Sequence, residues 1–250
     1  MTTTESHQQN EMEDEFFNSF LDVDIVEPVR RVWCERCGRP ERVCVCSAFP
    51  PEPFPIDTTV HIMQHPREQD FRLLTTVPLL AECLPKDKCI IYRGKRFSPT
   101  KFPTLHDICN LEDTIVLYPS PDAVSIEDYL AEAPRTNINM VVLDGTWREA
   151  KSIYFNNKFL HKLRKVKLCG SFGKSAFVIR TQPNNNSVST SEAVAIAVGK
   201  LEGRAEELLE VVRKPLKLMC DIQLEHGAQV HQSKEELAAM GIKYRVFEKH

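Results

Sequence analysis

The segment M-V-V-L-D-G-T-W-R-E-A, residues 140–150, decides the fold class of this chain. Its apolar run predicts a buried strand that ends at Asp144, and Gly145 predicts a turn. Thr146 and Glu149 have the spacing of a capping box, so a helix should begin there. Because ligands bind at the carboxyl ends of parallel strands, Asp144 is a candidate functional residue. The alternative is that Asp144 only ends the strand and caps the helix.

Strands and helices alternate on both sides of this segment. Strands are predicted over residues 58–64, 89–92, 114–118, 139–143 and 176–179, and helices over 72–84, 146–156, 190–202 and 205–220. This alternation predicts an α/β fold, with a mostly parallel sheet that is covered by helices on both faces.

Three further segments place polar groups at predicted strand ends or helix starts. L-Y-P-S at 117–120 follows one strand, and Arg180 follows the predicted strand 176–179. S-T-S-E-A at 189–193 is a second capping box, and capping alone would explain Ser189 and Glu192. One pocket shared by these segments and Asp144 is the simplest interpretation.

Four cysteines lie within thirteen residues, at Cys34, Cys37, Cys44 and Cys46. Four thiolates this close can form a tetrahedral Zn²⁺ site, and Gly38 and Pro40 supply the turn between the two pairs. Four cysteine ligands leave no open coordination position, so the zinc would be structural. Redox or disulfide chemistry is the competing interpretation. The other five cysteines are scattered singly, which is typical of a reducing compartment.

The charge distribution divides the chain unevenly. Residues 1–27 contain eight acidic residues and no Lys or Arg, and we expect them to form a disordered tail. The rest has 27 acidic and 32 basic residues, a net charge of +5. Along the chain we expect a cysteine-rich zinc module over 28–47, a proline-rich connector over 48–57 and the α/β domain over 58–250.

Basic residues cluster between Arg148 and Arg180, where nine Lys or Arg accompany a single Glu. Such clusters supply the sequence-independent part of nucleic-acid affinity. The alternative is a solvated face without a polyanionic partner.

Several function classes lack their motifs. Apolar runs such as residues 140–143 are too short to cross a membrane. The first residues lack a basic region followed by an apolar run, so we expect no secretory signal. G-S-F-G-K-S at 170–175 resembles the end of a P-loop, but Leu168 stands where its first glycine belongs. Neither G-x-G-x-x-G nor G-x-S-x-G occurs.

Taken together, the motifs resemble those of the DTW-domain family, and more closely those of the eukaryotic tRNA-uridine aminocarboxypropyltransferases. The resemblance rests on the cysteine pattern at 34–46, Q-H-P at 64–66, L-Y-P-S at 117–120, D-G-T-W at 144–147, R-T-Q-P at 180–183 and S-T-x-E-A at 189–193. It runs from about Val32 to beyond Gln229.

This resemblance implies a SPOUT-like fold with a trefoil knot in the C-terminal half. It implies S-adenosylmethionine as donor, N3 of a D-loop uridine in tRNA as acceptor, and methylthioadenosine as by-product. The residues expected to hold the donor are Leu117, Tyr118, Pro119, Ser120, Gly145, Thr146, Trp147, Arg180, Ser189, Thr190 and Glu192. Those expected to bind tRNA phosphates are Lys158, Lys162, Arg164, Lys165 and Lys167.

The uridine imide must lose its proton as it attacks, and Asp144 is the residue expected to accept that proton. Alternatively, Asp144 orients the amino group of the donor. Trp147 either packs in the core or stacks on a base. Two other functions remain open, a SPOUT-type RNA methyltransferase and a non-catalytic zinc-bearing RNA-binding protein. A tRNA enzyme without a membrane span is expected in the cytoplasm, the nucleus or both, and the sequence leaves the oligomeric state open.

Overall fold

The computed structural model describes residues 32–69, 74–132 and 137–242, so the acidic tail at 1–27 lies outside the described residues. The chain divides into two units, Met1–Val32 and Trp33–His250. Every helix and strand below belongs to the second unit.

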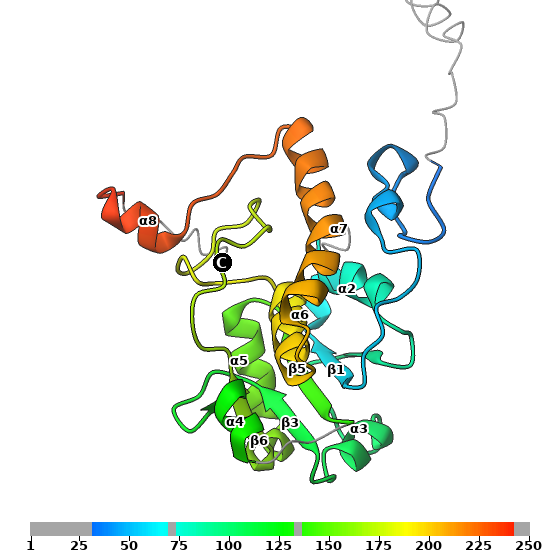
Figure 1. The fold of residues 1–250 in the computed structure, drawn as a ribbon, viewed down its shortest axis with the longest axis vertical. Coiled ribbons are helices and arrows are strands. Elements are labelled where there is room, and N and C mark those ends of the chain that lie inside the picture. Colours follow the sequence, from blue (N-terminus) through cyan, green and yellow to red (C-terminus); the bar gives the residue numbers. More distant parts are fainter. Residues whose placement is uncertain (1–31, 70–73, 133–136, 243–250) are drawn as a thin grey trace, which may run out of the picture. The chain divides into compact units, whose positions relative to one another are not determined.

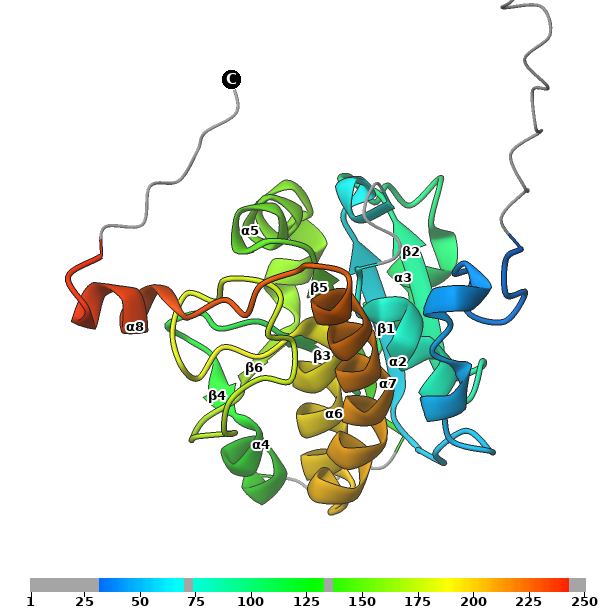
Figure 2. The same cartoon turned by 90° about the horizontal axis from the view of Figure 1, so that it is seen from above.

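Six strands form one sheet in the order β2-β1-β5-β3-β6-β4 (Figures 1 and 2). They are β1 Thr59–Gln64, β2 Cys89–Arg93, β3 Thr114–Leu117, β4 Val124–Ser125, β5 Asn139–Asp144 and β6 Arg164–Lys167. Every pair of neighbours is parallel. The predicted parallel sheet is therefore confirmed.

Apolar cores cover both faces of this sheet. Along β5, Met140 and Val142 pack in one core, and Val141 and Leu143 pack in the other. Side chains of a strand alternate between faces, so a strand buried on both sides needs an unbroken apolar run. This explains the sequence M-V-V-L.

Helices lie on each face, as the sequence predicted. They are α2 Val77–Cys83, α3 Pro103–Ile108, α4 Ile126–Glu132, α5 Trp147–Asn156, α6 Thr190–Leu201, α7 Ala205–Glu225 and α8 Lys234–Ala239. Short 3-10 helices are η1 Glu41–Val43, η2 Cys46–Ala48, η3 Pro66–Gln69 and η4 Lys158–Lys162. Helices α6 and α7 lie side by side over one face with α2 and α4, and α3 and α5 pack against the other (Figure 2).

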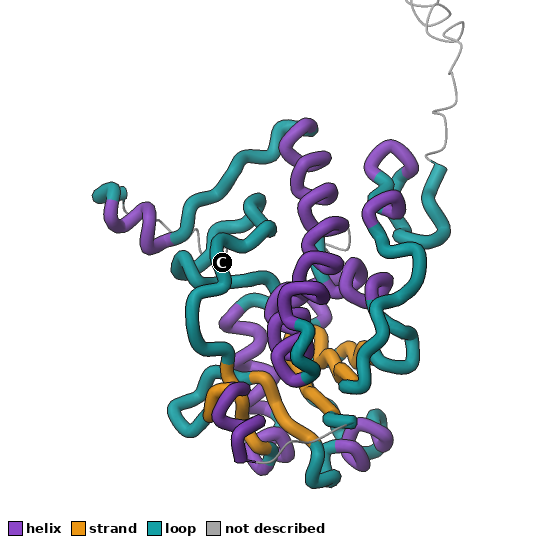
Figure 3. Tube along the Cα trace, in the orientation of Figure 1, coloured by secondary structure: helices purple, strands orange, loops and turns teal. Residues whose placement is uncertain are grey.

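The strand predicted over 176–179 is wrong. These residues belong to the loop that joins β6 to α6 (Figure 3). Phe177 packs in the core without a strand partner, and a short apolar run cannot reveal this by its periodicity. The strand next to β3 is β6, which begins at Arg164 within the basic stretch and has Val166 as its one fully buried residue. Helices α3, α4 and α8 were also not predicted.

The chain after α7 runs along this loop. The backbone N–H of His231 donates to the carbonyl of Val178 at 2.8 Å, and that of Lys234 donates to the carbonyl of Gln182 at 2.9 Å. The loop that precedes α6 is therefore held by a segment some fifty residues later in the chain.

Candidate functional site

Asp144 and Gln64 lie side by side at the carboxyl edge of the sheet. They are the last residues of β5 and β1 and are register partners. Gln64 Nε2 donates a hydrogen bond of 2.9 Å to Asp144 Oδ2. The two residues are only 4% and 5% exposed, so little solvent screens this contact. The position predicted for Asp144, at the end of a buried strand, is confirmed.

Arg93 orients the Gln64 amide. Arg93 is the last residue of β2, and its Nε donates to Gln64 Oε1 at 3.1 Å. Because the amide oxygen faces Arg93, the amide nitrogen faces Asp144. Three neighbouring strands thus contribute one residue each to a hydrogen-bonded chain. No functional role was predicted for Gln64 or Arg93. The available signals were that Gln64 is the last residue of a predicted strand and the first residue of the Q-H-P motif.

Thr190 and Arg180 complete the surroundings of Asp144. Burial raises the pKa of Asp144 above its ordinary value, and hydrogen bonds from Gln64 and Thr190 and the charge of Arg180 offset part of that rise. The structure therefore brings Asp144, Thr190 and Arg180 together as predicted, although Arg180 follows a loop and not a strand. A buried carboxylate with a raised pKa is suited to accept a proton.

The turn after Asp144 requires glycine. Gly145 has φ +149°, and a Cβ there would lie 3.0 Å from Glu149 Cβ and 3.3 Å from His65 Cβ. Thr146 and Glu149 form the predicted capping box of α5. The backbone N–H of His65 donates to the Asp144 carbonyl at 2.9 Å. Glycine thus lets α5 start close to the strand end.

The same turn brings a histidine and a carboxylate together. His65 Nδ1 lies 3.4 Å from Glu149 Oε1. Burial lowers the pKa of His65, and Glu149 offsets this only in part. Burial would raise the pKa of Glu149, but hydrogen bonds from Thr146 and the charges of His65 and Arg67 lower it overall. The Glu149 carboxylate is therefore ionised at neutral pH, and its oxygens already contact Thr146 and His65.

Glu192, in the first turn of α6, is fully buried and saturated by donors. Its oxygens accept from the hydroxyl and N–H of Ser189, the hydroxyl of Ser175, the N–H of Ala176 and Nε of Arg213. Burial would raise the pKa of Glu192, but these hydrogen bonds lower it overall. The predicted capping box of Ser189 and Glu192 is confirmed. The Glu192 carboxylate also fixes the loop before α6 to α7.

The L-Y-P-S segment follows β3 at the same edge of the sheet. Leu117 pairs with Val142 of β5, so the segment starts beside the end of that strand. Tyr118 stacks on Tyr154 of α5, with ring centroids 4.1 Å apart and an interplanar angle of 9°. Pro119 is exposed and Ser120 is half-buried.

Trp147, the first residue of α5, does not pack in the core. It is 59% exposed. Core packing, one of the two interpretations of the sequence, is therefore excluded, and the indole is free to contact a partner.

The four predicted zinc ligands converge. All four Sγ atoms lie within 4.8 Å of one another, with Cys37–Cys44 at 3.7 Å and Cys34–Cys46 at 3.5 Å. A tetrahedral zinc with Zn–S bonds near 2.3 Å requires S–S distances of about 3.8 Å. The cluster therefore fits a metal ion of tetrahedral preference.

The five cations predicted to bind RNA lie on η4 and β6. They are Lys158, Lys162, Arg164, Lys165 and Lys167. Arg164 Nη2 lies 2.5 Å from Glu132, and Lys165 Nζ lies 2.9 Å from Asp122. The two on η4 are exposed and form no ion pair with any described residue. They are thus better placed than Arg164 and Lys165 to meet phosphates.

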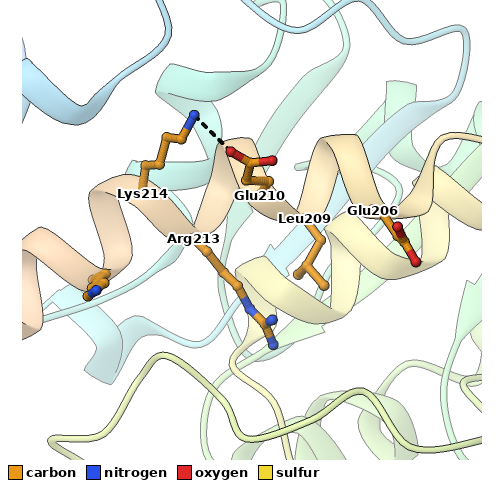
Figure 4. A pocket seen from close by; sticks show the side chains of 6 residues that line it. Glu206, Leu209, Glu210, Arg213 and Lys214 are labelled. Atoms are coloured by element: carbon orange, nitrogen blue, oxygen red, sulfur yellow. Dashed lines mark ion pairs between the residues drawn. The ribbon is translucent and has the colours of Figure 1, made fainter.

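Two hollows of the described surface contain none of the residues that contact Asp144. One follows α7 and is lined by Glu206, Leu209, Glu210, Arg213, Lys214 and Lys217, with Lys214 paired to Glu210 at 3.1 Å (Figure 4). None of the residues that contact Asp144 lines it. Within the described residues, no helix is both long enough and apolar enough to cross a bilayer.

Comparison with known proteins agrees with this arrangement. A family model described as the DTW domain matches residues 31–224. tRNA-uridine aminocarboxypropyltransferase 2 of Macaca fascicularis is 41% identical over 218 residues, which are 87% of this chain and 72% of that protein. Its namesake in Drosophila melanogaster is 40% identical over 228 residues, 90% of this chain and 88% of that protein. No solved structure matches the chain. Because the family match spans most of the chain, this chain belongs to the DTW domain family.

Proposed function

We propose that the chain is an S-adenosylmethionine-dependent tRNA-uridine aminocarboxypropyltransferase. It transfers the 3-amino-3-carboxypropyl group to N3 of a D-loop uridine in tRNA and releases methylthioadenosine. Relatives that carry this enzyme's name are 40–41% identical over most of the chain. The observation that carries the proposal is the buried carboxylate of Asp144, held by Gln64 and Thr190 at the carboxyl edge of the sheet.

The reaction needs a base because uridine N3 is protonated at neutral pH. As N3 attacks the donor carbon next to the sulfonium, the N–C bond forms and the C–S bond breaks. The C–S electron pair stays on sulfur, and the imide proton passes to Asp144. Burial raises the pKa of Asp144, which brings its proton affinity closer to that of the group it must deprotonate. The competing role of Asp144, orientation of the donor amino group, predicts a loss of donor affinity on mutation.

The donor supplies an electrophilic carbon and a good leaving group, and the strand-end residues would hold it. We assign this role to Leu117, Tyr118, Pro119, Ser120, Gly145, Thr146, Trp147, Arg180, Ser189 and Thr190. The charge of Arg180 beside Asp144 suits the donor carboxylate. Glu192 contributes indirectly, since its carboxylate is occupied by five protein donors and orders the loop that carries Arg180.

The metal of the cysteine cluster is assigned as a structural Zn²⁺ bound by Cys34, Cys37, Cys44 and Cys46. Four thiolates and one Zn²⁺ leave a net charge of −2, which buried surroundings must compensate. Arg39 is 2% exposed. Its guanidinium interacts electrostatically with Cys37, Cys44 and Cys46. That cation supports the assignment. Val45 and Phe49 belong to the apolar core of the sheet, so zinc would also stabilise the surface on which they pack.

The finer fold and the domain limits are proposals as well. A SPOUT-like fold with a trefoil knot in the C-terminal half is supported by the parallel sheet and by the segment after α7 that lies along the loop before α6. The proposed divisions are the tail at 1–27, the zinc module at 28–47, the connector at 48–57 and the catalytic domain at 58–250. Since tRNA is the proposed substrate, the expected location is the cytoplasm, the nucleus or both.

The test is a transfer assay with purified protein, S-adenosylmethionine and an unmodified tRNA transcript. Nuclease digestion and mass spectrometry should find an aminocarboxypropyl-uridine in the D-loop, with methylthioadenosine released in equal amount. Methylated RNA and adenosylhomocysteine would indicate a methyltransferase. Binding of tRNA with no adduct of either kind would indicate a non-catalytic RNA-binding protein.

A further inference from the structure

Helix α5 carries an exposed face that combines aromatic and cationic side chains. Trp147 and Phe155 are each 59% exposed, and Arg148 and Lys151 between them are exposed as well. At 100° per residue, these four positions fall within an arc of about 100°. Large exposed aromatics are unusual on a helix whose opposite face, with Ile153, is already buried. The exposed face of α5 therefore has the composition of a surface that binds a partner.

The charge of this face is not neutralised within the described residues. Arg148 and Lys151 form no ion pair with any of them. Glu149 is the single acidic residue from Trp147 to Lys167, and its carboxylate faces Thr146 and His65 instead. Unpaired cations beside exposed rings complement a polyanion that carries flat, stackable groups.

The aromatic side chains on this face connect to the candidate site. Phe155 lies edge-on to Tyr154, with ring centroids 5.5 Å apart, and Tyr154 stacks on Tyr118 at the end of β3. Phe155 also contacts the ring of His161 at 6.2 Å. These contacts hold the Phe155 ring in place before a partner binds. Trp147 follows Asp144 by only three residues, so the face begins at the strand end itself.

We propose that this α5 face, Trp147, Arg148, Lys151 and Phe155, binds the single-stranded loop of tRNA that presents the acceptor uridine. Unstacked bases would stack on the two aromatic rings, while Arg148 and Lys151 bind the adjacent phosphates. Positions 147 and 155 are about 12 Å apart along the helix axis, a length that accommodates a few nucleotides. This inference rests on the proposed function for the identity of the RNA, and its test is a binding measurement that needs no turnover.

The test measures the affinity of an unmodified tRNA transcript for Phe155→Ala and Lys151→Ala at several salt concentrations. The matched controls are Leu111→Ala, an equally exposed apolar residue, and Lys217→Ala, an exposed lysine on α7 without an ion pair to the described residues. Loss of one stacked base should weaken binding about 5- to 150-fold for Phe155→Ala. Phe155→Trp should restore most of it. Lys151→Ala should reduce the slope of log affinity against log salt by about 1.

Wild-type affinity in both α5 variants would overturn the inference, whatever the outcome of the transfer assay. If these variants keep wild-type RNA affinity but change the oligomeric state, the α5 face is instead an interface between copies of this chain. Calorimetry with S-adenosylmethionine should give unchanged donor affinity in Phe155→Ala and Lys151→Ala. If the wild type binds tRNA through this face but forms no adduct, the proposed enzymatic function fails and the binding surface stands.

Discussion

Replacing Gln64 with Leu tests how the strand-end carboxylate is tuned. The substitution keeps a side chain of similar size but removes the hydrogen bond to Asp144 Oδ2. A hydrogen bond to an ionised group is worth about 1.5–3 kcal/mol, and both residues here are buried, so solvent would restore little of it. The ionised form of Asp144 should lose that stabilisation.

The sign of the effect follows from the role of the carboxylate. A base must be ionised to act, so activity should rise with pH as Asp144 loses its proton. Removing a donor to the ionised form raises the pKa of Asp144, so the acid limb of the kcat profile should move to higher pH. The free-energy loss corresponds to a displacement of roughly one to two pH units.

The assay is the pH dependence of single-turnover transfer in the wild type and in Gln64→Leu, with donor and tRNA saturating. Asn139→Ala is the matched control, because it removes a hydrogen bond to His61 at the opposite end of the same two strands. Asn139→Ala should leave the acid limb of the kcat profile at the wild-type pH. An equal loss of activity at every pH in Gln64→Leu would refute the tuning and leave Gln64 a packing residue.

Four other predictions concern the base, the metal, the turn and the basic stretch. Asp144→Asn should lower turnover about 10²- to 10⁴-fold with donor affinity unchanged by calorimetry, and raising the pH should restore part of it. Cys46→Ser should lower the zinc content measured by elemental analysis from about one ion per chain and destabilise the protein. Gly145→Ala should destabilise the fold by about 1–3 kcal/mol in denaturant titrations, because its φ and its close neighbours exclude a Cβ. Charge reversal of Lys158 and Lys162 should weaken the binding of different tRNAs alike, with a shallower salt dependence.

Each of these has an outcome that would contradict it. Weakened donor binding without alkaline rescue in the Asp144 variant would make that carboxylate a donor clamp. Wild-type zinc content in the cysteine variant would remove Cys46 from the site. An unchanged unfolding free energy for the glycine variant would show that the turn can relax. Unchanged tRNA affinity after charge reversal would leave the two lysines a solvated face.

Much of the fold could be predicted because its local signals agree with its tertiary structure. The unbroken apolar runs within β3 and β5 are needed by strands that are buried on both faces. The capping boxes at Thr146 and Ser189 marked two helix starts correctly. The predictions failed where tertiary packing, and not the local sequence pattern, determines the secondary structure. Residues 176–179 are apolar because the loop fills a core, and β6 is polar because it buries little more than Val166.

The site was predictable in its position and less so in its contacts. A strand end identified Asp144 and a helix start identified Thr190, because ligands bind at the carboxyl edge that parallel strands share. Arg180 was chosen as the end of a strand that the structure does not contain. The chain from Arg93 through Gln64 to Asp144 depends on the order β2-β1-β5, which no local pattern contains.

The fate of two labels on the donor tests the proposed enzymatic function most directly. One preparation of S-adenosylmethionine carries the label in the aminocarboxypropyl chain and the other in the methyl group, and each is incubated with the protein and unmodified tRNA. The proposed function predicts chain label on a D-loop uridine and methyl label in released methylthioadenosine. Methyl label on the RNA, with chain label left in adenosylhomocysteine, would contradict it.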